Sequence, residues 1–191
     1  MNTQEAQMQV VNGVNVTDLV NTVGAVKEMP GLAKFKFRIS NQWIDCGHTQ
    51  SRVADFHGAH QDHQHASTFL LEADEPAILL GQDQGANPVE HLLHALAACV
   101  TTSMVFHAAA KGIHIEKVES TIEGNTDLRG FLGLDPGVRN GYESIRMSFR
   151  IKADLPESEL QDLVQMGPKF SPVFDSISRG VPFEVVANSF C

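Results

Sequence analysis

The longest apolar segment of the chain, PVEHLLHALAACVTTSMVFHAAAK from Pro88 to Lys111, constrains the fold most. Asn87 precedes it as a good N-cap, Pro88 suits the first helical position, and Glu90 falls where a capping box places its acid. Gly112 is a typical C-terminal stop. The segment therefore predicts one helix of 24 residues, about 36 Å long. Because Ala, Leu, Val and Met lie around its whole circumference, we expect protein to surround it.

Alternation and helical spacing predict the elements around this helix. A short helix is expected at 17–28 with Thr17 as its cap, and another at 156–167 that ends at Pro168. Ser171 is a typical N-cap for a further short helix. Residues 45–66 are polar and rich in His, which indicates a loop, with one short strand within it as the alternative. Strands are expected at 34–40, 67–74, 118–125, 144–154 and 182–188. The order of these elements predicts an α+β fold: strands, a buried helix, more strands and further helices.

Length and charge exclude several classes of protein. A chain of 191 residues is long enough for one domain, or one domain with an extension, and needs neither a disulfide nor a metal to fold. The 14 Lys and Arg against 23 Asp and Glu give a net charge of −9, which argues against a nucleic-acid or anionic-membrane partner. No basic, apolar leader begins the chain, so we expect a cytoplasmic location. Neither a dinucleotide nor a Walker motif is present, and we expect no cofactor.

The three cysteines are Cys46, Cys99 and Cys191. An odd number at wide spacing is not typical of a disulfide framework, and no pair has the close spacing of a zinc site or a Cys-x-x-Cys redox motif. Cys99 lies in the middle of the long apolar helix. Free cysteine often serves there as a small buried hydrophobe, and the alternative is that Cys99 is a nucleophile.

Three stretches carry a resemblance to a known family: NPVEHLLHALAACVTTS, the paired strands at 116–154, and SPVFDSISRGVPFEVV. In combination they resemble the OsmC/Ohr family, with the match strongest at 67–188. We therefore expect an N-terminal helical extension at 1–32 and an OsmC-like domain at 33–191. The resemblance implies an intertwined homodimer. In it, a long central buried helix and a second helix pack against antiparallel sheets.

The resemblance also implies a thiol peroxidase that reduces organic hydroperoxides. In such members a cysteine of the central helix attacks the peroxide, a second cysteine directly before Pro-Val resolves the sulfenic acid, and an Arg and a Glu activate the first. Carried over, Cys99 is the attacking residue and Glu90 the acid, but Ser171 stands at the resolving position. No Arg occurs from Ser67 through Val100. The prediction is therefore a one-cysteine cycle with an external thiol reductant.

Several alternatives remain open around Cys99. Cys46 or Cys191 is a candidate resolving thiol, and Arg38, Arg52 or a histidine is a candidate for the missing cation. Helical spacing places Leu92, Ala95, Leu96, Thr102, Ser103 and Phe106 on the face of Cys99, with His91 and His107 about 80° to either side. The same face also suits a non-catalytic dimer that binds a small apolar molecule.

A cluster of histidines lies in FHGAHQDHQH. His57, His60, His63 and His65 occur within nine residues, with Asp62 among them. Dense His tracts can bind zinc, copper or nickel, so metal binding is a third hypothesis. The spacing matches no standard closed site, and a solvated polar loop is the alternative.

Overall fold

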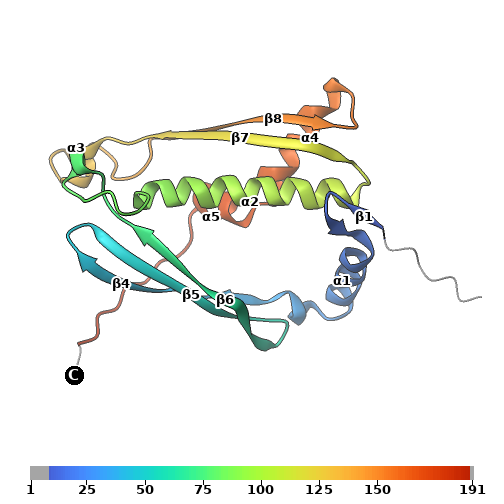
Figure 1. Cartoon of the computed structure of the whole chain (residues 1–191), viewed down its shortest axis with the longest axis horizontal. Coiled ribbons are helices and arrows are strands. Elements are labelled where there is room, and N and C mark those ends of the chain that lie inside the picture. The colour runs from blue at the N-terminus through green and yellow to red at the C-terminus, as the bar shows by residue number, and fades with distance from the viewer. Residues whose placement is uncertain (1–8, 190–191) are drawn as a thin grey trace, which may run out of the picture. The chain divides into compact units, whose positions relative to one another are not determined.

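The computed structural model describes residues 9–189 (Figure 1). The chain divides between His94 and Ala95 into two compact units, called here the N-terminal unit and the C-terminal unit. Each has its own antiparallel sheet, and each is described by itself.

The N-terminal unit begins with a two-stranded ribbon, β1 (Val10–Val11) and β2 (Val14–Asn15), and continues into α1 (Val16–Glu28) and the short 3₁₀ helix η1 (Pro30–Ala33). The cap of α1 is Asn15, whose side chain accepts a hydrogen bond from the Asp18 N–H at 3.2 Å. The prediction of Thr17 as the cap was therefore wrong. The helix starts one residue before Thr17, and an Asn side chain is an equally good acceptor at that earlier position.

A four-stranded sheet forms most of the N-terminal unit. The central strand β5 (His48–Gly58) pairs with β3 (Phe35–Phe37) and β4 (Ser40–Asp45) on one side and with β6 (Gln61–Ala73) on the other, all antiparallel. The loop expected at 45–66 was wrong, because β5 and the first half of β6 occupy it. The strands there alternate little between apolar and polar residues. Their tight turn is built on left-handed Ala59 and His60 instead of the usual Asn-Gly.

The predicted long helix is α2 (Pro88–Ala110), which begins in the N-terminal unit and continues into the other. It is covered on one side only: Leu96, Val100, Met104, Ala108 and Ala109 are buried. Leu92 and Phe106 keep 38% and 45% of their surface exposed. Within a single chain, protein therefore covers α2 only in part.

The C-terminal unit packs a two-stranded sheet and two helices on α2. The strands β7 (Ile115–Asn125) and β8 (Ser144–Ala153) run along the helix in Figure 1, and a link with the short helix α3 (Leu128–Phe131) joins them. The core is centred on Met104, Ala108 and Leu163, with Phe149 and Ile151 of β8 packed against it. Every second residue of β8 is half-buried, which confirms the alternation expected there.

Two helices complete the C-terminal unit, α4 (Glu157–Phe170) and α5 (Pro172–Arg179). Pro168 was expected to end the first of them but lies inside its last turn. A proline near the C-terminal end of a helix removes only one backbone hydrogen bond, and this helix continues for two residues beyond it. The strand expected at 182–188 was also wrong, since residues 181–189 are irregular and exposed. No strand of the described chain pairs with that segment, and a lone extended segment has no ladder to join.

One helix within residues 9–189, α2, is long and apolar enough to cross a membrane by length and composition. Its buried face packs on β8 and α4 through a side-chain core. That packing is typical of the core helix of a globular fold, which passes the same test.

Candidate functional site

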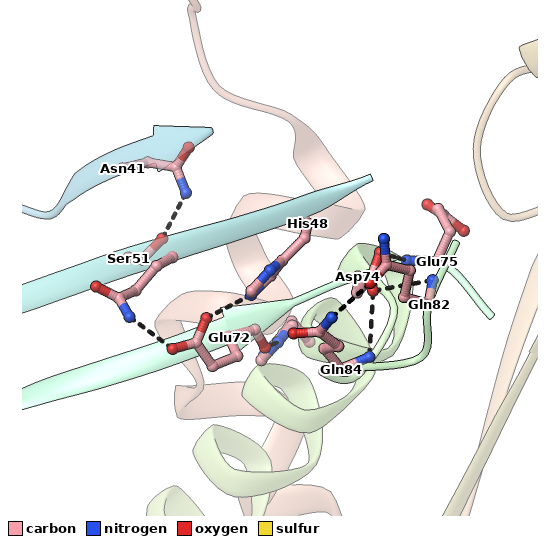
Figure 2. A network of polar contacts seen from close by, with 10 residues as sticks. Asn41, His48, Ser51, Glu72, Asp74, Glu75, Gln82 and Gln84 are labelled. Atoms are coloured by element: carbon pink, nitrogen blue, oxygen red, sulfur yellow. Dashed lines mark hydrogen bonds and ion pairs between the residues drawn. The ribbon is translucent and has the colours of Figure 1, made fainter. Parts of the chain in front are cut away.

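A buried carboxylate fixes the loop that leads into α2. Asp74 is 1% exposed, and its oxygens accept the backbone N–H groups of Glu75 at 2.8 Å and of Gln82 and Gln84 at 3.1 Å each (Figure 2). Burial raises the pKa of the Asp74 carboxyl, but the three backbone donors outweigh it and hold the pKa below its ordinary value. The ionised side chain therefore ties together both ends of the loop at 75–84.

Next to Asp74, Glu72 links β6 to β5 through its carboxylate and to the first turn of α2 through its backbone carbonyl. Glu72 accepts hydrogen bonds from Gln50 at 2.6 Å and is paired with His48 at 2.8 Å (Figure 2). The Gln50 amide, and after it His48, lowers the pKa of Glu72. The His91 ring N–H donates to the Glu72 carbonyl at 2.9 Å. His91, a candidate pocket residue, is thus engaged in holding the helix to the sheet.

The start of α2 has the capping box that the sequence predicts. The Val89 N–H donates to the Asn87 side-chain oxygen at 2.9 Å, and Glu90 accepts the Asn87 N–H at 2.9 Å. The Asn87 amide also donates to Glu75. Glu90, the candidate catalytic acid, therefore has a structural contact at the helix start.

Cys99 is a free, half-buried thiol on the part of α2 that belongs to the C-terminal unit. It forms no hydrogen bond or ion pair with any residue that the structure describes. On its side of the helix, Thr102 and Phe106 are exposed and Ser103 is half-buried. The thiol thus borders the uncovered side of α2.

Ser171, at the resolving position of the family pattern, is a buried helix cap. It is 2% exposed, and its oxygen accepts the Phe174 N–H at 3.1 Å. The turn before it packs on α2. A side chain at Gly167 would come within 2.7 Å of Val100 Cγ1, so the glycine permits a close approach of α4 to α2. The prediction that Ser171 is an N-cap is confirmed. Its hydroxyl oxygen cannot act as a redox thiol.

His107 stacks on Phe170 in the last turn of α4, with 3.6 Å between the ring centroids and 16° between the planes. Burial lowers the pKa of His107, and the charges of Lys111 and Lys169 lower it further. The neutral imidazole is therefore favoured. The sequence placed His107 near a pocket, and the structure gives it a packing partner at the junction of α4 and α5.

The histidines of the β5–β6 hairpin have separate partners. His57 is paired with Asp62 at 3.1 Å, and the His63 ring N–H donates to the Gly58 carbonyl at 3.0 Å. His63 stacks on Phe56, the His65 ring contacts Phe56 at a tilt, and His60 lies in the turn. Within residues 9–189 no three His, Cys, Asp or Glu side chains form a group that can hold a metal ion. The geometry does not favour the metal hypothesis.

The remaining candidates lie in the N-terminal unit. Arg38 is bonded to Asp55 and, at 3.2 Å, to Asp62, while Arg52 has no ion pair among the described residues. Cys46 is exposed, and its thiol donates to the Leu80 carbonyl at 3.2 Å. Cys191 lies outside the described residues.

Sequence reasoning did not single out Asp74 or Glu72. Both lie at the end of a predicted strand, in LLEADE, where acidic residues are ordinary surface residues. The only available signal is the Gly- and Gln-rich loop that follows them, whose free backbone N–H groups need acceptors.

Comparisons with known proteins identify the fold. Residues 81–186, more than half of the chain, match the family model described as OsmC-like protein. The chain belongs to the OsmC-like family. No curated protein matches it.

Solved structures of OsmC-like proteins share its fold. An OsmC-like protein from Mycoplasma pneumoniae superposes with a TM-score of 0.57 at 19% identity, over 75% of this chain and 87% of that one. A putative osmotic stress induced and detoxification response protein from Psychrobacter arcticus gives 0.55 at 15%, over 74% and 88%. An organic hydroperoxide resistance protein OsmC from Legionella pneumophila, also named a predicted redox protein, gives 0.53 at 18%, over 74% and 88%. The predicted α+β, OsmC-like fold is confirmed.

Proposed function

We propose that this OsmC-like protein is a thiol-dependent peroxidase that reduces organic hydroperoxides through Cys99 in a one-cysteine cycle. The observation that carries the proposal is the free, half-buried Cys99 in the middle of α2, in a chain of this family. The name of the Legionella relative, organic hydroperoxide resistance protein, supports the substrate class. Ser171, a buried helix cap, supports the single-cysteine form.

The reaction balances with one external reductant, a small or protein thiol. The Cys99 thiolate attacks the terminal oxygen of the hydroperoxide, the O–O bond breaks, and the alkoxide leaves and takes up a proton to become the alcohol. Cys99 is thereby oxidised to a sulfenic acid. One reductant thiol then forms a mixed disulfide with Cys99 and releases water, and a second restores the Cys99 thiol and leaves as the oxidised disulfide.

The decisive experiment follows the loss of the reduced Cys99 thiol by intact mass after addition of cumene hydroperoxide, with hydrogen peroxide run beside it. Cys99→Ser is the control for the nucleophile, and Cys46→Ser controls for the exposed second thiol. We expect a rate far above that of free cysteine, abolished only in Cys99→Ser. A rate equal to that of free cysteine would remove the peroxidase proposal.

Three further variants test the candidate acid and the candidate cation of the site. Glu90→Gln retains an oxygen that can accept the Asn87 N–H but removes the charge, so a slower reaction at unchanged stability assigns Glu90 to the chemistry. Arg52→Gln is examined beside Arg38→Gln, because Arg38 already has two carboxylate partners and Arg52 has none among the described residues. We expect the larger loss of rate for Arg52.

We also propose that the protein works as a homodimer in the cytoplasm. Twenty-eight large apolar side chains are exposed among the described residues of the single chain, including Leu92 and Phe106 of α2. Extensive exposed apolar surface is typical of a protein–protein interaction site, so a second copy is the expected cover. A reducing compartment would supply the external thiol. Sedimentation at a series of protein concentrations tests the dimer, and a monomer at every concentration would contradict it.

A further inference from the structure

An apolar cavity of about 260 Å³, partly open to solvent, lies in the C-terminal unit between α2, β8, α4 and α5. Leu96 and Val100 of α2 form one wall, and Met147 and Phe149 of β8 form another. Nine of the eleven residues that line it have apolar side chains. Cys99 does not line it, so the cavity is separate from the proposed thiol chemistry.

The packing of the helices keeps this space open. The close approach of Gly167 to Val100 sets α4 on α2, and the buried Ser171 cap then turns the chain into α5. Phe174 and Ile177 of α5 lie at the rim, where both remain exposed. Because Leu96 and Val100 are themselves buried and fixed, we expect the cavity to exist before a ligand enters.

The chemistry of the lining limits what can enter. No Asp, Glu, Lys, Arg or His lines the cavity, so a charged group inside would lose its hydration without a partner. The Ser178 hydroxyl already donates to the Phe174 carbonyl at 2.7 Å. The exposed Gln165 amide forms no hydrogen bond within residues 9–189. It is therefore the side chain at the cavity that can both donate a hydrogen bond to a ligand and accept one from it.

We propose that this cavity binds a neutral, apolar small molecule with one hydrogen-bonding group, of the size of a substituted benzene. The volume exceeds the ~150 Å³ of an engineered apolar cavity that binds benzene. The apolar body would occupy the space between α2 and β8, and its single hydroxyl or carbonyl group would meet Gln165. The proposal goes beyond the peroxidase function and does not depend on it.

The first test is a titration of the full-length protein with 4-fluorobenzyl alcohol, followed by ¹⁹F NMR. Val164→Phe fills the cavity from α4, and Val181→Phe makes the same change at an exposed position outside it. We expect binding by the wild type, at least tenfold weaker binding by Val164→Phe, and unchanged binding by Val181→Phe. Equal binding by all three, or none by the wild type, would overturn the proposal.

A rim variant guards against a folding defect in Val164→Phe. Ile177→Trp enlarges an exposed side chain at the rim, where there is room outside the fold. With an unchanged circular dichroism spectrum, we expect it to weaken binding of the alcohol by at least tenfold. Undiminished binding in this folded variant would place the ligand elsewhere.

The role of Gln165 is tested with two probes. Gln165→Leu should weaken 4-fluorobenzyl alcohol by about two- to tenfold, the range of one neutral hydrogen bond, and leave fluorobenzene unchanged. If both probes weaken equally, the amide is not the ligand's partner and the proposed orientation is wrong.

Two measurements separate this site from the thiol and from a second copy. Cys99→Ser should bind 4-fluorobenzyl alcohol as the wild type does, even if the peroxidase proposal fails. Binding should also be independent of protein concentration. Binding that appears only in dilute, monomeric samples would show that a second copy fills the cavity, and would overturn the small-molecule site.

Discussion

The two units of this protein differ in what they bury. In the C-terminal unit, Met104, Ala108 and Leu163 form a core from which solvent is fully or almost fully excluded. In the described part of the N-terminal unit only Gly58 and Asp74 are buried, and Phe37, Trp43 and Leu70 of its sheet are exposed. One unit is held by apolar packing, and the other by strand pairing and by the carboxylates of Asp74 and Glu72.

This contrast indicates which part of the fold depends on a partner. Apolar burial contributes about 25 cal/mol per Å² and is the main favourable term in folding, so a sheet without it has little stability of its own. The C-terminal unit contains its own core. We infer that the N-terminal sheet completes its burial only when a second chain covers it, as in the proposed dimer.

The largest expected effect comes from breaking the core of the C-terminal unit. Leu163→Ala removes a fully buried side chain, and we expect the free energy of unfolding to fall by about 2–5 kcal/mol. Urea unfolding measures it. A loss near zero would mean that the core is not the source of stability in this unit.

The next effect tests the N-terminal sheet. Phe37 is 73% exposed; its ring stacks with Phe35 and contacts Phe56 at a tilt. If a second copy covers Phe37, Phe37→Ser removes about 1.5–3 kcal/mol of the free energy of apolar burial. The dimer dissociation constant then rises at least about tenfold. Sedimentation equilibrium measures this, with Ile78→Ser, at an 88% exposed loop position, as the control. An unchanged dimer constant would mean that the partner does not cover Phe37.

A smaller effect is expected at the junction of α4 and α5. Ser171→Ala removes the cap of α5 and should lower the free energy of unfolding by about 0.5–2 kcal/mol. Ser176→Ala, five residues along the same helix and exposed, should stay within about 0.5 kcal/mol of the wild type. Equal effects for the two variants would contradict the capping role.

The smallest effect concerns pH. The pKa of His107 is lowered in the folded protein, so the unfolded chain binds the proton first as the pH falls below about 6.5. By linkage, the contribution of His107 makes the free energy of unfolding increase as the pH rises through this window, and decrease as the pH is lowered through it. His107→Phe keeps the stack on Phe170 and should flatten the dependence of urea midpoints between pH 7 and 5. An identical slope in both proteins would rule out this contribution.

The sequence allowed the start of α2 and most of the C-terminal unit to be predicted. The capping box at Asn87 and Glu90, the alternation along β8 and the Ser171 cap are local signals, and the structure confirms each. Pro168 misled because its position relative to the end of the helix, which depends on packing against α2, is not a local property.

The N-terminal sheet and the site environment were harder to predict. Strands β5 and the first half of β6 have no apolar alternation, because the chain does not bury one of their faces. The role of Asp74 depends on a loop that returns to it eight to ten residues later, and the stacking of His107 on Phe170 joins residues far apart in sequence. Such long-range contacts leave no periodic pattern in the sequence.

The two-residue turn at Ala59 and His60 has a consequence for the order of folding. Strands β5 and β6 meet across this turn, whereas β7 and β8 must close the 18 residues at 126–143. Loop-closure entropy grows with the logarithm of loop length, which makes the second hairpin about 2 kcal/mol costlier to close. We therefore expect the β5–β6 hairpin to form before the β7–β8 hairpin. The less buried sheet then forms first and stays uncovered while the core around Met104 assembles.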